Sequence, residues 1–128
     1  MTPHTPQILV IDDDEAILSL FQDALTPEYR VRTTPEWLEG TNLLLEEKYD
    51  LLILDLSMPV FDSVEYISKL NTDFPRVPIL VISAYPNLRE RVETLSVAGS
   101  LAKPFSIQDL RSTVAQLLTP RERTADVN

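Results

Sequence analysis

The 128-residue chain has no cysteine and a single histidine, His4. Without cysteine the protein forms no disulfide bond and has no thiol for catalysis or for binding a metal. One histidine near the N-terminus also argues against a histidine-based zinc site or a catalytic triad. Any metal ion in this protein must therefore be held by oxygen ligands.

Apolar runs of membrane-spanning length and an excess of basic residues are absent as well. No apolar run approaches the roughly 20 residues that span a bilayer, and the N-terminal "MTPHTPQ" lacks the basic and apolar regions of a secretory signal. The net charge of −9 argues against unaided binding to nucleic acid or anionic lipid, which requires clustered Lys and Arg. We therefore expect a cytoplasmic protein that contacts neither nucleic acid nor a membrane directly.

The composition is that of a globular domain, with 44% hydrophobic and 24% charged residues. Three apolar runs, "QILVI" (7–11), "LLILD" (51–55) and "PILVIS" (78–83), are continuous rather than alternating. This pattern is typical of parallel strands that are buried on both faces. Two weaker strands fit "YRVRT" (29–33) and "LAK" (101–103).

Apolar residues at helical spacing lie between these strands and predict helices that pack on the sheet. The expected stripes are Ile17, Leu18, Phe21 and Leu25; Leu38, Thr41, Leu44 and Leu45; Val64, Ile67 and Leu70; and Ile107, Leu110, Val114 and Leu117. Ser106 with Asp109 resembles a capping box for the last helix, and the more polar segment 87–98 predicts a further helix. Five strands alternating with five helices imply right-handed crossovers and a three-layer α/β domain over residues 1–118. The polar residues 119–128 are expected to form a flexible tail or the start of a linker.

Polar residues stand at the carboxyl ends of the predicted strands. Asp12 and Asp13 follow the first strand, Asp55 ends the third, Ser83 ends the fourth, and Lys103 follows the fifth. In open parallel sheets, ligands bind beyond this edge. Two carboxylates ~4 Å apart repel by about 4 kcal/mol at an effective dielectric constant near 20, so three of them require a cation or raised pKa values. An all-oxygen site with few protein ligands suits Mg²⁺.

Each of these residues also has a simpler explanation. We assign Asp14 to capping the first helix, where aspartate is favoured. Lys103 alone would be a solvated surface charge and Ser83 alone a turn hydroxyl, so their shared edge is what makes them candidates. Asp55 resists such an explanation, because a charge is costly within the strand "LLILD". A calcium-binding EF-hand loop starting at Asp12 does not fit, because its sixth and twelfth residues would be isoleucine and aspartate.

Four segments together resemble the receiver domains of two-component response regulators over nearly the whole chain. They are "ILVIDDDEAI" (8–17), "DLLILDLSMP" (50–59), "PILVISA" (78–84) and "LAKPF" (101–105). The resemblance implies a doubly wound (βα)5 parallel sheet of strand order 2-1-3-4-5. It implies a phosphoacceptor signalling protein rather than a conventional enzyme. Such a domain receives a phosphoryl group from a sensor histidine kinase or a histidine phosphotransfer protein and assists its own phosphorylation and dephosphorylation.

The resemblance also implies a role for each polar residue. Asp55 matches the phosphoacceptor. The implied Mg²⁺ ligands are Asp12, acting largely through water, Asp13, Asp55 and the backbone carbonyl of Ser57. Ser83 matches the hydroxyl that bonds a phosphoryl oxygen, and Lys103 matches the lysine that pairs with it. The family further implies a cis peptide bond between Lys103 and Pro104.

Two residues depart from the family pattern. Ser63 stands where the family usually has glycine, and Ser100 stands where it usually has an aromatic residue whose rotation reports phosphorylation. Tyr85 is an alternative aromatic residue near the site. Phosphorylation is expected to bias the face made by the fourth helix, fifth strand and fifth helix toward an output protein or a second copy of the chain.

Two other functional classes compete with a phosphorylated switch. Haloacid-dehalogenase-like phosphatases and phosphotransferases also use an aspartyl nucleophile, but they carry a D-x-D pattern, whereas Asp55 is followed by Leu56 and Ser57. A degenerate receiver that only binds partners usually lacks one of the five site residues, and none is lacking here.

Overall fold

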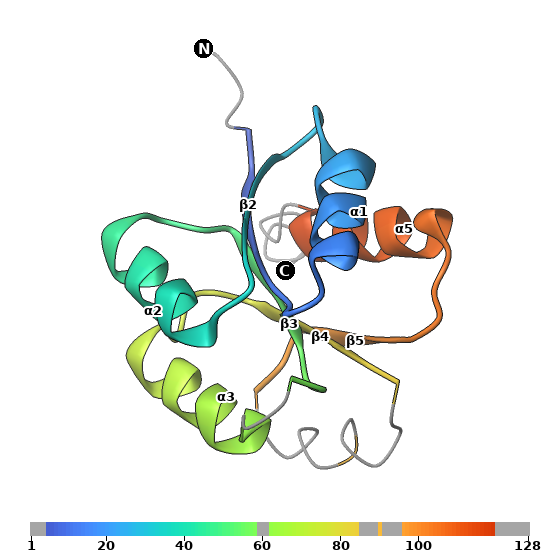
Figure 1. Ribbon diagram of the computed structural model, residues 1–128. Coiled ribbons are helices and arrows are strands. Elements are labelled where there is room, and N and C mark those ends of the chain that lie inside the picture. The colour runs from blue at the N-terminus through green and yellow to red at the C-terminus, as the bar shows by residue number, and fades with distance from the viewer. Residues whose placement is uncertain (1–4, 59–61, 85–89, 91–95, 120–128) are drawn as a thin grey trace, which may run out of the picture.

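The computed structural model describes residues 5–58, 62–84, 90 and 96–119, and its centre is a five-stranded parallel sheet (Figure 1). The strands are β1 (Gln7–Ile11), β2 (Arg30–Thr34), β3 (Leu51–Asp55), β4 (Ile79–Ser83) and β5 (Gly99–Ala102). Their order is β2-β1-β3-β4-β5, which confirms the predicted topology. The ends of the two weaker strands differ from the prediction by one or two residues.

Four helices are described: α1 (Glu15–Leu25), α2 (Trp37–Glu46), α3 (Ser63–Asp73) and α5 (Ile107–Leu118). In Figure 1, α1 and α5 cover one face of the sheet and α2 and α3 cover the other, so the three predicted layers are confirmed. The helix predicted over 87–98 falls mostly outside the described residues, as does Tyr85. Among the described residues, no helix is both long and apolar enough to cross a membrane.

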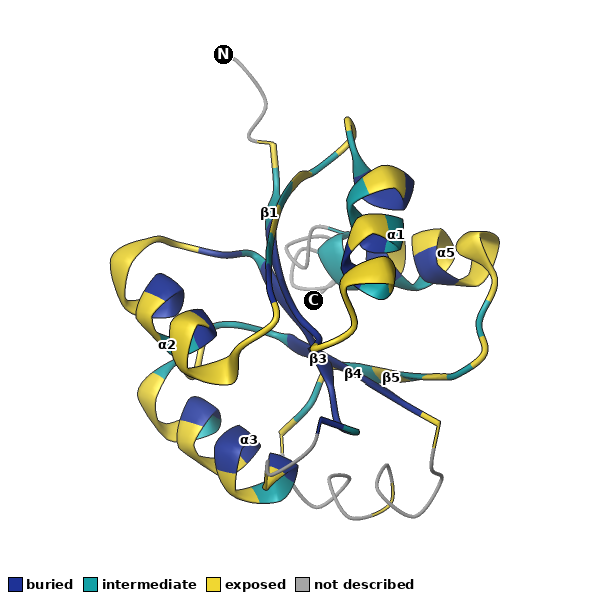
Figure 2. Ribbon diagram, viewed as in Figure 1, coloured by how far each residue is buried: buried dark blue, intermediate teal, exposed yellow. Residues whose placement is uncertain are grey.

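The continuous apolar runs reflect burial on both faces of the sheet (Figure 2). In β1, Ile8 and Val10 pack with α1 and α5, whereas Leu9 and Ile11 pack with α2 and α3. Neighbouring side chains of a strand point to opposite faces. A strand that is covered on both sides therefore needs an apolar residue at every position. The side chains of β3 alternate in the same way between the two faces. Asp55, at the end of β3, is the only charged residue of that strand.

Side chains cap three of the helices. Asp14 caps α1 by accepting the backbone N–H of Ala16 at 2.9 Å, and Ser106 caps α5 by accepting that of Asp109 at 2.9 Å. The Asp14 cap confirms its prediction, and the Ser106 bond confirms the N-cap half of the predicted capping box. Asp62 caps α3 in the same way. These caps satisfy backbone groups that would otherwise be left unpaired at the helix starts.

The predicted inward face of α2 was wrong in part. Leu38 and Leu45 were expected to pack on the sheet, but their side chains are 60% and 71% exposed. The buried residues of α2 are Gly40, Leu43 and Leu44. Ile107, at the start of α5, is also 37% exposed. The remaining residues of its stripe, and the stripes predicted for α1 and α3, pack against the core.

Gly40 explains why the α2 prediction failed. A Cβ atom at this position would lie 2.3 Å from Cδ1 of Ile11, so α2 approaches β1 at a point where only hydrogen fits. A glycine adds nothing to an apolar pattern, because it has no side chain. The spacing of the apolar residues therefore placed Leu44 correctly but turned Leu38 and Leu45 toward the sheet.

Candidate functional site

Main-chain hydrogen bonds of the sheet continue past the strand ends and position the polar residues there. The amide of Asp12 donates to the carbonyl oxygen of Thr34 at 3.2 Å, and the amide of Lys103 donates to the carbonyl oxygen of Ser83 at 3.0 Å. Asp55 is itself the last residue of β3 and is paired with β4. The sheet therefore brings the predicted site residues to one edge, as expected for parallel strands.

Burial divides these residues into two groups. Asp12, Asp55 and Ser83 are buried, with 1%, 3% and 1% of their surface exposed. Asp13 is exposed and Lys103 is partly buried. Carboxylates are rarely this buried unless they are paired or bind a metal. The local arrangement must therefore compensate two buried negative charges.

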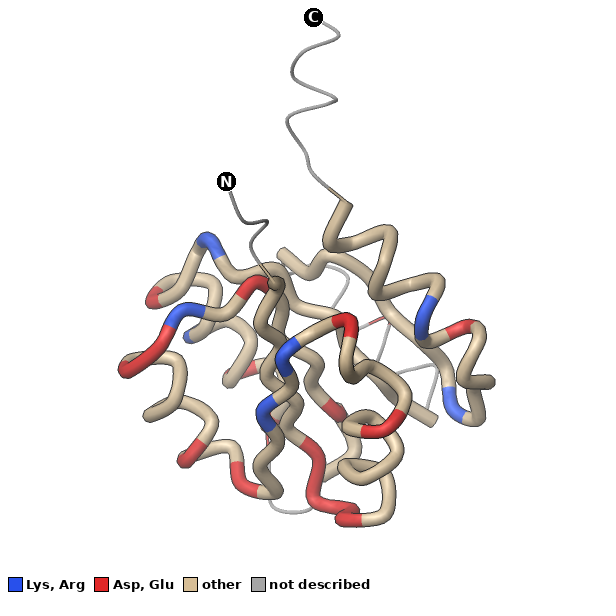
Figure 3. The backbone as a smooth tube through the Cα atoms, turned by 90° about the horizontal axis from the view of Figure 1, so that it is seen from above, with Lys and Arg blue, Asp and Glu red and all other residues tan. Residues whose placement is uncertain are grey.

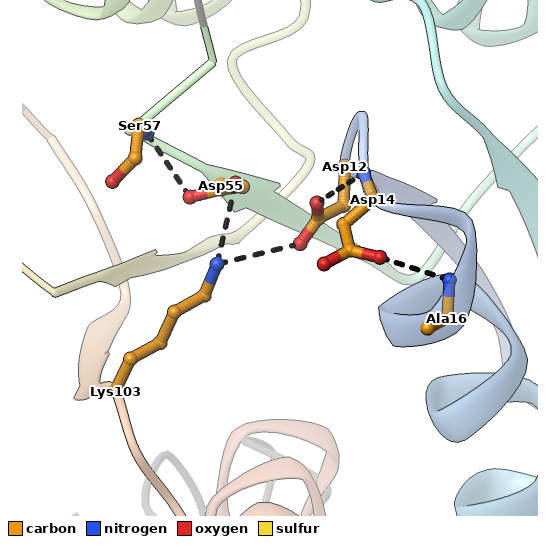
Figure 4. Close-up of polar contacts among 6 residues, drawn as sticks. All are labelled: Asp12, Asp14, Ala16, Asp55, Ser57 and Lys103. Atoms are coloured by element: carbon orange, nitrogen blue, oxygen red, sulfur yellow. Dashed lines mark hydrogen bonds and ion pairs between the residues drawn. The ribbon is translucent and has the colours of Figure 1, made fainter.

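Lys103 supplies part of that compensation. Its Nζ atom lies 3.4 Å from Oδ2 of Asp55 and 3.8 Å from Oδ2 of Asp12 (Figure 4). The lysine thus reaches from the end of β5 to the carboxylates of both β1 and β3. The Lys103–Pro104 peptide bond that precedes α5 is cis, as predicted; the cis bond between Thr26 and Pro27 was not predicted.

Backbone amides fix the other oxygen of each buried carboxylate. Oδ1 of Asp12 accepts the amide of Asp14 at 2.9 Å, and Oδ1 of Asp55 accepts the amide of Ser57 at 3.0 Å. Each aspartate is thus held by the amide two residues further along the chain, and its Oδ2 atom is directed toward Lys103. Sequence reasoning did not identify these two amides, although aspartates often bind the amide two residues on.

The third carboxylate completes a cluster that can bind a metal ion. Asp12, Asp13 and Asp55 each offer a carboxylate oxygen, and these atoms all lie within 4.8 Å of one another. Oδ2 of Asp12 is buried and has no hydrogen-bond partner, although Lys103 lies nearby. Three clustered carboxylates with an orphaned oxygen fit a hard divalent cation such as Mg²⁺.

The electrostatics of Asp12 agree with this fit. Burial raises the pKa of the Asp12 carboxyl group from 3.8 to about 6, and the charges of Asp55 and Asp13 add to the increase. The Asp14 amide and the Lys103 ammonium group oppose it without cancelling it. One lysine is therefore insufficient for this cluster, and a further positive charge would stabilise the ionised form.

Three other predicted residues have definite positions. Ser57 follows Asp55 by two residues, and its Oγ atom is buried without a hydrogen-bond partner. Ser63, where the family usually has glycine, is the first residue of α3 and is buried. Ser100, where the family usually has an aromatic residue, lies in β5 and is exposed. The Ser57 carbonyl remains a predicted metal ligand.

A family model described as the response regulator receiver domain matches residues 8–115. The chain is 34% identical over 118 residues to the sensor histidine kinase TmoS of Ectopseudomonas mendocina, covering 89% of this chain and 12% of that protein. It is 32% identical over 124 residues to the transcriptional regulatory protein PrrA of Mycobacterium tuberculosis, covering 94% of this chain and 53% of PrrA. The chain thus spans about half the length of PrrA and a much smaller part of the length of TmoS.

Solved structures agree with the fold. The response regulator TrrA of Thermotoga maritima, in complex with Mg²⁺ and BeF, superposes with a TM-score of 0.80 at 27% identity, covering 89% of this chain and all of that one. The receiver domain of an HD domain-containing protein from Pseudomonas fluorescens has a TM-score of 0.86 at 22% identity, over 98% and 96% of the two chains, and supports the fold alone. The family match, the strand order and the carboxylate cluster lead to one conclusion: this chain belongs to the response regulator receiver domains of two-component signalling systems.

Proposed function

We propose that Asp55 accepts the phosphoryl group in this receiver domain, with Asp12 and Asp13 holding Mg²⁺ beside it. The observation that carries this proposal is the environment of the Asp55 carboxylate. It is buried at the sheet edge, with one oxygen held by the Ser57 amide at 3.0 Å and the other 3.4 Å from Nζ of Lys103.

Phosphoryl transfer demands mainly alignment of a carboxylate nucleophile, because the transition state is loose and its charge lies mostly on the phosphoryl oxygens. An Asp55 oxygen attacks phosphorus while the bond from phosphorus to the histidine nitrogen, or to the oxygen of a small phosphodonor, breaks. The product is an acyl phosphate. The Ser57 amide fixes the carboxylate beforehand, so that less orientational freedom is lost on reaction.

Members of this family bind Mg²⁺ at an acidic pocket, and the donor set here fits that ion. Bound Mg²⁺ would neutralise charge on the carboxylates and on the phosphoryl oxygens. Asp12, Asp13 and Asp55 would hold it, together with the predicted Ser57 carbonyl. The orphaned Oδ2 atom of Asp12 is the specific support for this assignment.

Lys103 and Ser83 complete the site in this proposal. Lys103 pairs with Asp55 before transfer, and its long flexible stem lets the same ammonium group pair with a phosphoryl oxygen afterwards. Ser83 ends β4, the strand next to that of Asp55, and would supply a hydroxyl group for another phosphoryl oxygen. The same groups stabilise the charge that develops when water attacks the phosphorus and releases the group as phosphate.

Receiver domains interact with histidine kinases and output domains. We infer that residues 1–118 form the switch, that its phosphodonor is a sensor histidine kinase or a histidine phosphotransfer protein, and that 119–128 serve as a tail or linker. The phosphoryl group of the acyl phosphate carries about −1.5 to −2 charge, in place of the single negative charge of the Asp55 carboxylate. Pairing of that charge with Ser83 and Lys103 would bias the predicted face of the fourth helix, β5 and α5 toward an output protein or a second copy.

Intact-protein mass spectrometry after incubation with acetyl phosphate and Mg²⁺ tests the proposal. We expect one added phosphoryl group in the wild type and none in Asp55→Asn. Asp73→Asn, which changes an exposed aspartate at the end of α3, is the matched control and should be modified like the wild type. Retained modification of Asp55→Asn would refute the assignment, and steady turnover of p-nitrophenyl phosphate would favour a phosphatase instead.

A further inference from the structure

The exposed side of α2 carries large apolar side chains that the core does not use. Trp37, Leu38 and Leu45 are 43%, 60% and 71% exposed. Leu38, Thr41 and Leu45 are spaced three and four residues apart, so they are neighbours along one side of the helix. We call Trp37, Leu38, Thr41 and Leu45 the α2 face. Single exposed leucines are ordinary, but adjacent exposed apolar side chains often mark an interaction surface.

Contacts with α3 fix two residues of the α2 face, Trp37 and Thr41. The Trp37 and Tyr66 rings meet edge to face, with centroids 5.5 Å apart. The Tyr66 hydroxyl donates to the Trp37 carbonyl oxygen at 3.1 Å and lies 2.8 Å from Oγ1 of Thr41. Tyr66 itself is buried. A surface that is already ordered loses little conformational entropy when a partner covers it.

Charge around the α2 face indicates what kind of partner fits. Residues 36–47 include four glutamates, Glu36, Glu39, Glu46 and Glu47, and the nearest basic residue in the sequence is Lys48, directly after them. Acidic positions predominate over basic ones along the described backbone as a whole (Figure 3). Glutamates therefore flank the α2 face at both ends of the helix, and at the C-terminal end Arg32 and Lys48 offset part of their charge.

Two of these glutamates are already engaged and two remain available. Glu39 accepts the Thr34 hydroxyl, and Glu47 accepts the Tyr49 hydroxyl at 2.9 Å and lies 3.6 Å from Arg32. Glu36 and Glu46 are exposed, and no hydrogen bond or ion pair involves their side chains within the described part of the chain. Each can pair with a cation of an incoming molecule without losing an existing contact.

The same charge disfavours two other occupants. A second copy docked through this face would bring two sets of glutamates together, and an anionic membrane would repel them. We propose that the α2 face docks an amphipathic segment of a partner protein, whose apolar side chains cover Leu38 and Leu45 and whose Lys or Arg side chains pair with Glu36 and Glu46. This surface is separate from the carboxylate cluster, so the inference does not depend on the phosphoacceptor assignment.

Trp37 provides a direct readout, because it is the only tryptophan of the chain. The probe is a synthetic helical peptide with leucine on one side and lysine on the other, compared with a peptide in which glutamate replaces every lysine. We expect a saturable blue shift of Trp37 emission with the lysine peptide, weakened by added NaCl. The glutamate peptide should cause at least tenfold weaker binding or none.

Variants locate the binding surface. Leu38→Gln/Leu45→Gln should weaken binding of the lysine peptide at least tenfold, and Glu36→Gln/Glu46→Gln should weaken it and reduce its salt dependence. Ile107→Gln changes an exposed apolar residue of α5 and is the matched control that should bind like the wild type. Circular dichroism checks that each variant is folded.

Three results would overturn the proposal. One is equal binding of the lysine peptide by the leucine double variant, and another is equal binding of the two peptides. The third is a Trp37 shift without any peptide. It could be produced by anionic phosphatidylserine vesicles, or by raising the protein concentration if sedimentation then shows a dimer. In that case a membrane or a second copy would occupy the face instead.

Discussion

At the carboxyl edge of the sheet, charged groups are buried, whereas on the outer side of α2, large apolar groups are exposed. Asp12 and Asp55 lie almost entirely out of solvent, while Leu38 and Leu45 lie mostly in it. Both arrangements oppose the burial preferences of these residue types. Their costs differ, however, because a buried carboxylate must be compensated by specific neighbours, whereas an exposed leucine only forgoes burial. The first region should therefore respond strongly to substitution and the second weakly.

Removing one buried charge should give the largest effect on stability. In Mg²⁺-free protein at pH 8, Asp12→Asn should raise the free energy of unfolding by up to about 3 kcal/mol. The pKa of Asp12 is roughly two units higher in the folded protein than ordinarily, and each unit corresponds to about 1.4 kcal/mol. Urea unfolding measures this. Asp73→Asn is the control; its side chain is exposed and lies outside the carboxylate cluster, so the change should stay below about 0.5 kcal/mol.

The same pKa shift fixes the pH dependence of that difference. Because the pKa of Asp12 is about 6 in the folded protein against 3.8 ordinarily, the folded state binds more protons between these values. The contribution of this group to stability is present in full below about pH 4 and is lost as the pH rises through 6. The advantage of Asp12→Asn should therefore be larger at pH 8 than at pH 5, and saturating Mg²⁺ should reduce it. An advantage independent of pH would contradict this explanation.

The inner side of α2 should be the next most sensitive position. Gly40→Val should lower the free energy of unfolding by about 2 kcal/mol, because its side chain must displace the buried Ile11. Gly99→Val is the matched control, since a Cβ there meets Leu117 at an ordinary 3.7 Å and β-branched residues suit strands. Equal losses for both variants would show that α2 can move away from β1 more easily than its packing indicates.

Ser57 tests the buried edge on a smaller scale. Its Oγ atom is buried without a hydrogen-bond partner, so Ser57→Ala should raise stability by about 1 kcal/mol or less. Because this side chain stands two residues from Asp55, the proposed phosphoacceptor, the lifetime of the phosphorylated form should change as well. Thermal unfolding and the decay of the phosphorylated mass measure the two effects. An unchanged decay rate would exclude a role for the hydroxyl.

The outer side of α2 should show the smallest effect. Leu38→Gln/Leu45→Gln should change the free energy of unfolding by no more than about 0.5 kcal/mol for each residue, since both side chains are mostly exposed. Thermal unfolding checks this value. A loss comparable to that of Gly40→Val would mean that these leucines stabilise the fold. The outer side of α2 would then not be the less sensitive of the two regions.

The sheet and its polar edge were predictable because their signals are local and redundant. Each buried strand carries apolar residues at every position, and Asp55 and Ser83 are the points at which two of these runs end. The caps at Asp14 and Ser106 were predictable for a similar reason, because the capping residue lies within three residues of its amide partner.

What the sequence did not reveal depends on contacts between distant segments or on main-chain atoms. The orientation of α2 is decided by Gly40 meeting Ile11, a contact that carries no apolar signal. The amides that hold Asp12 and Asp55 belong to no recognisable side-chain pattern. Likewise, the raised pKa of Asp12 depends on how deeply the sheet edge is buried, which only the assembled fold determines.

Main-chain pairing continues beyond β1 and β5, where the amides of Asp12 and Lys103 are bonded to the neighbouring strands β2 and β4. The spacing of these two residues is consequently inherited from the sheet rather than from the loops that follow. Outward-facing side chains of the surrounding helices can be exchanged over evolutionary time without altering that spacing. The proposed phosphorylation site can in this way keep its geometry while the outer surface of the domain is adapted to different partners.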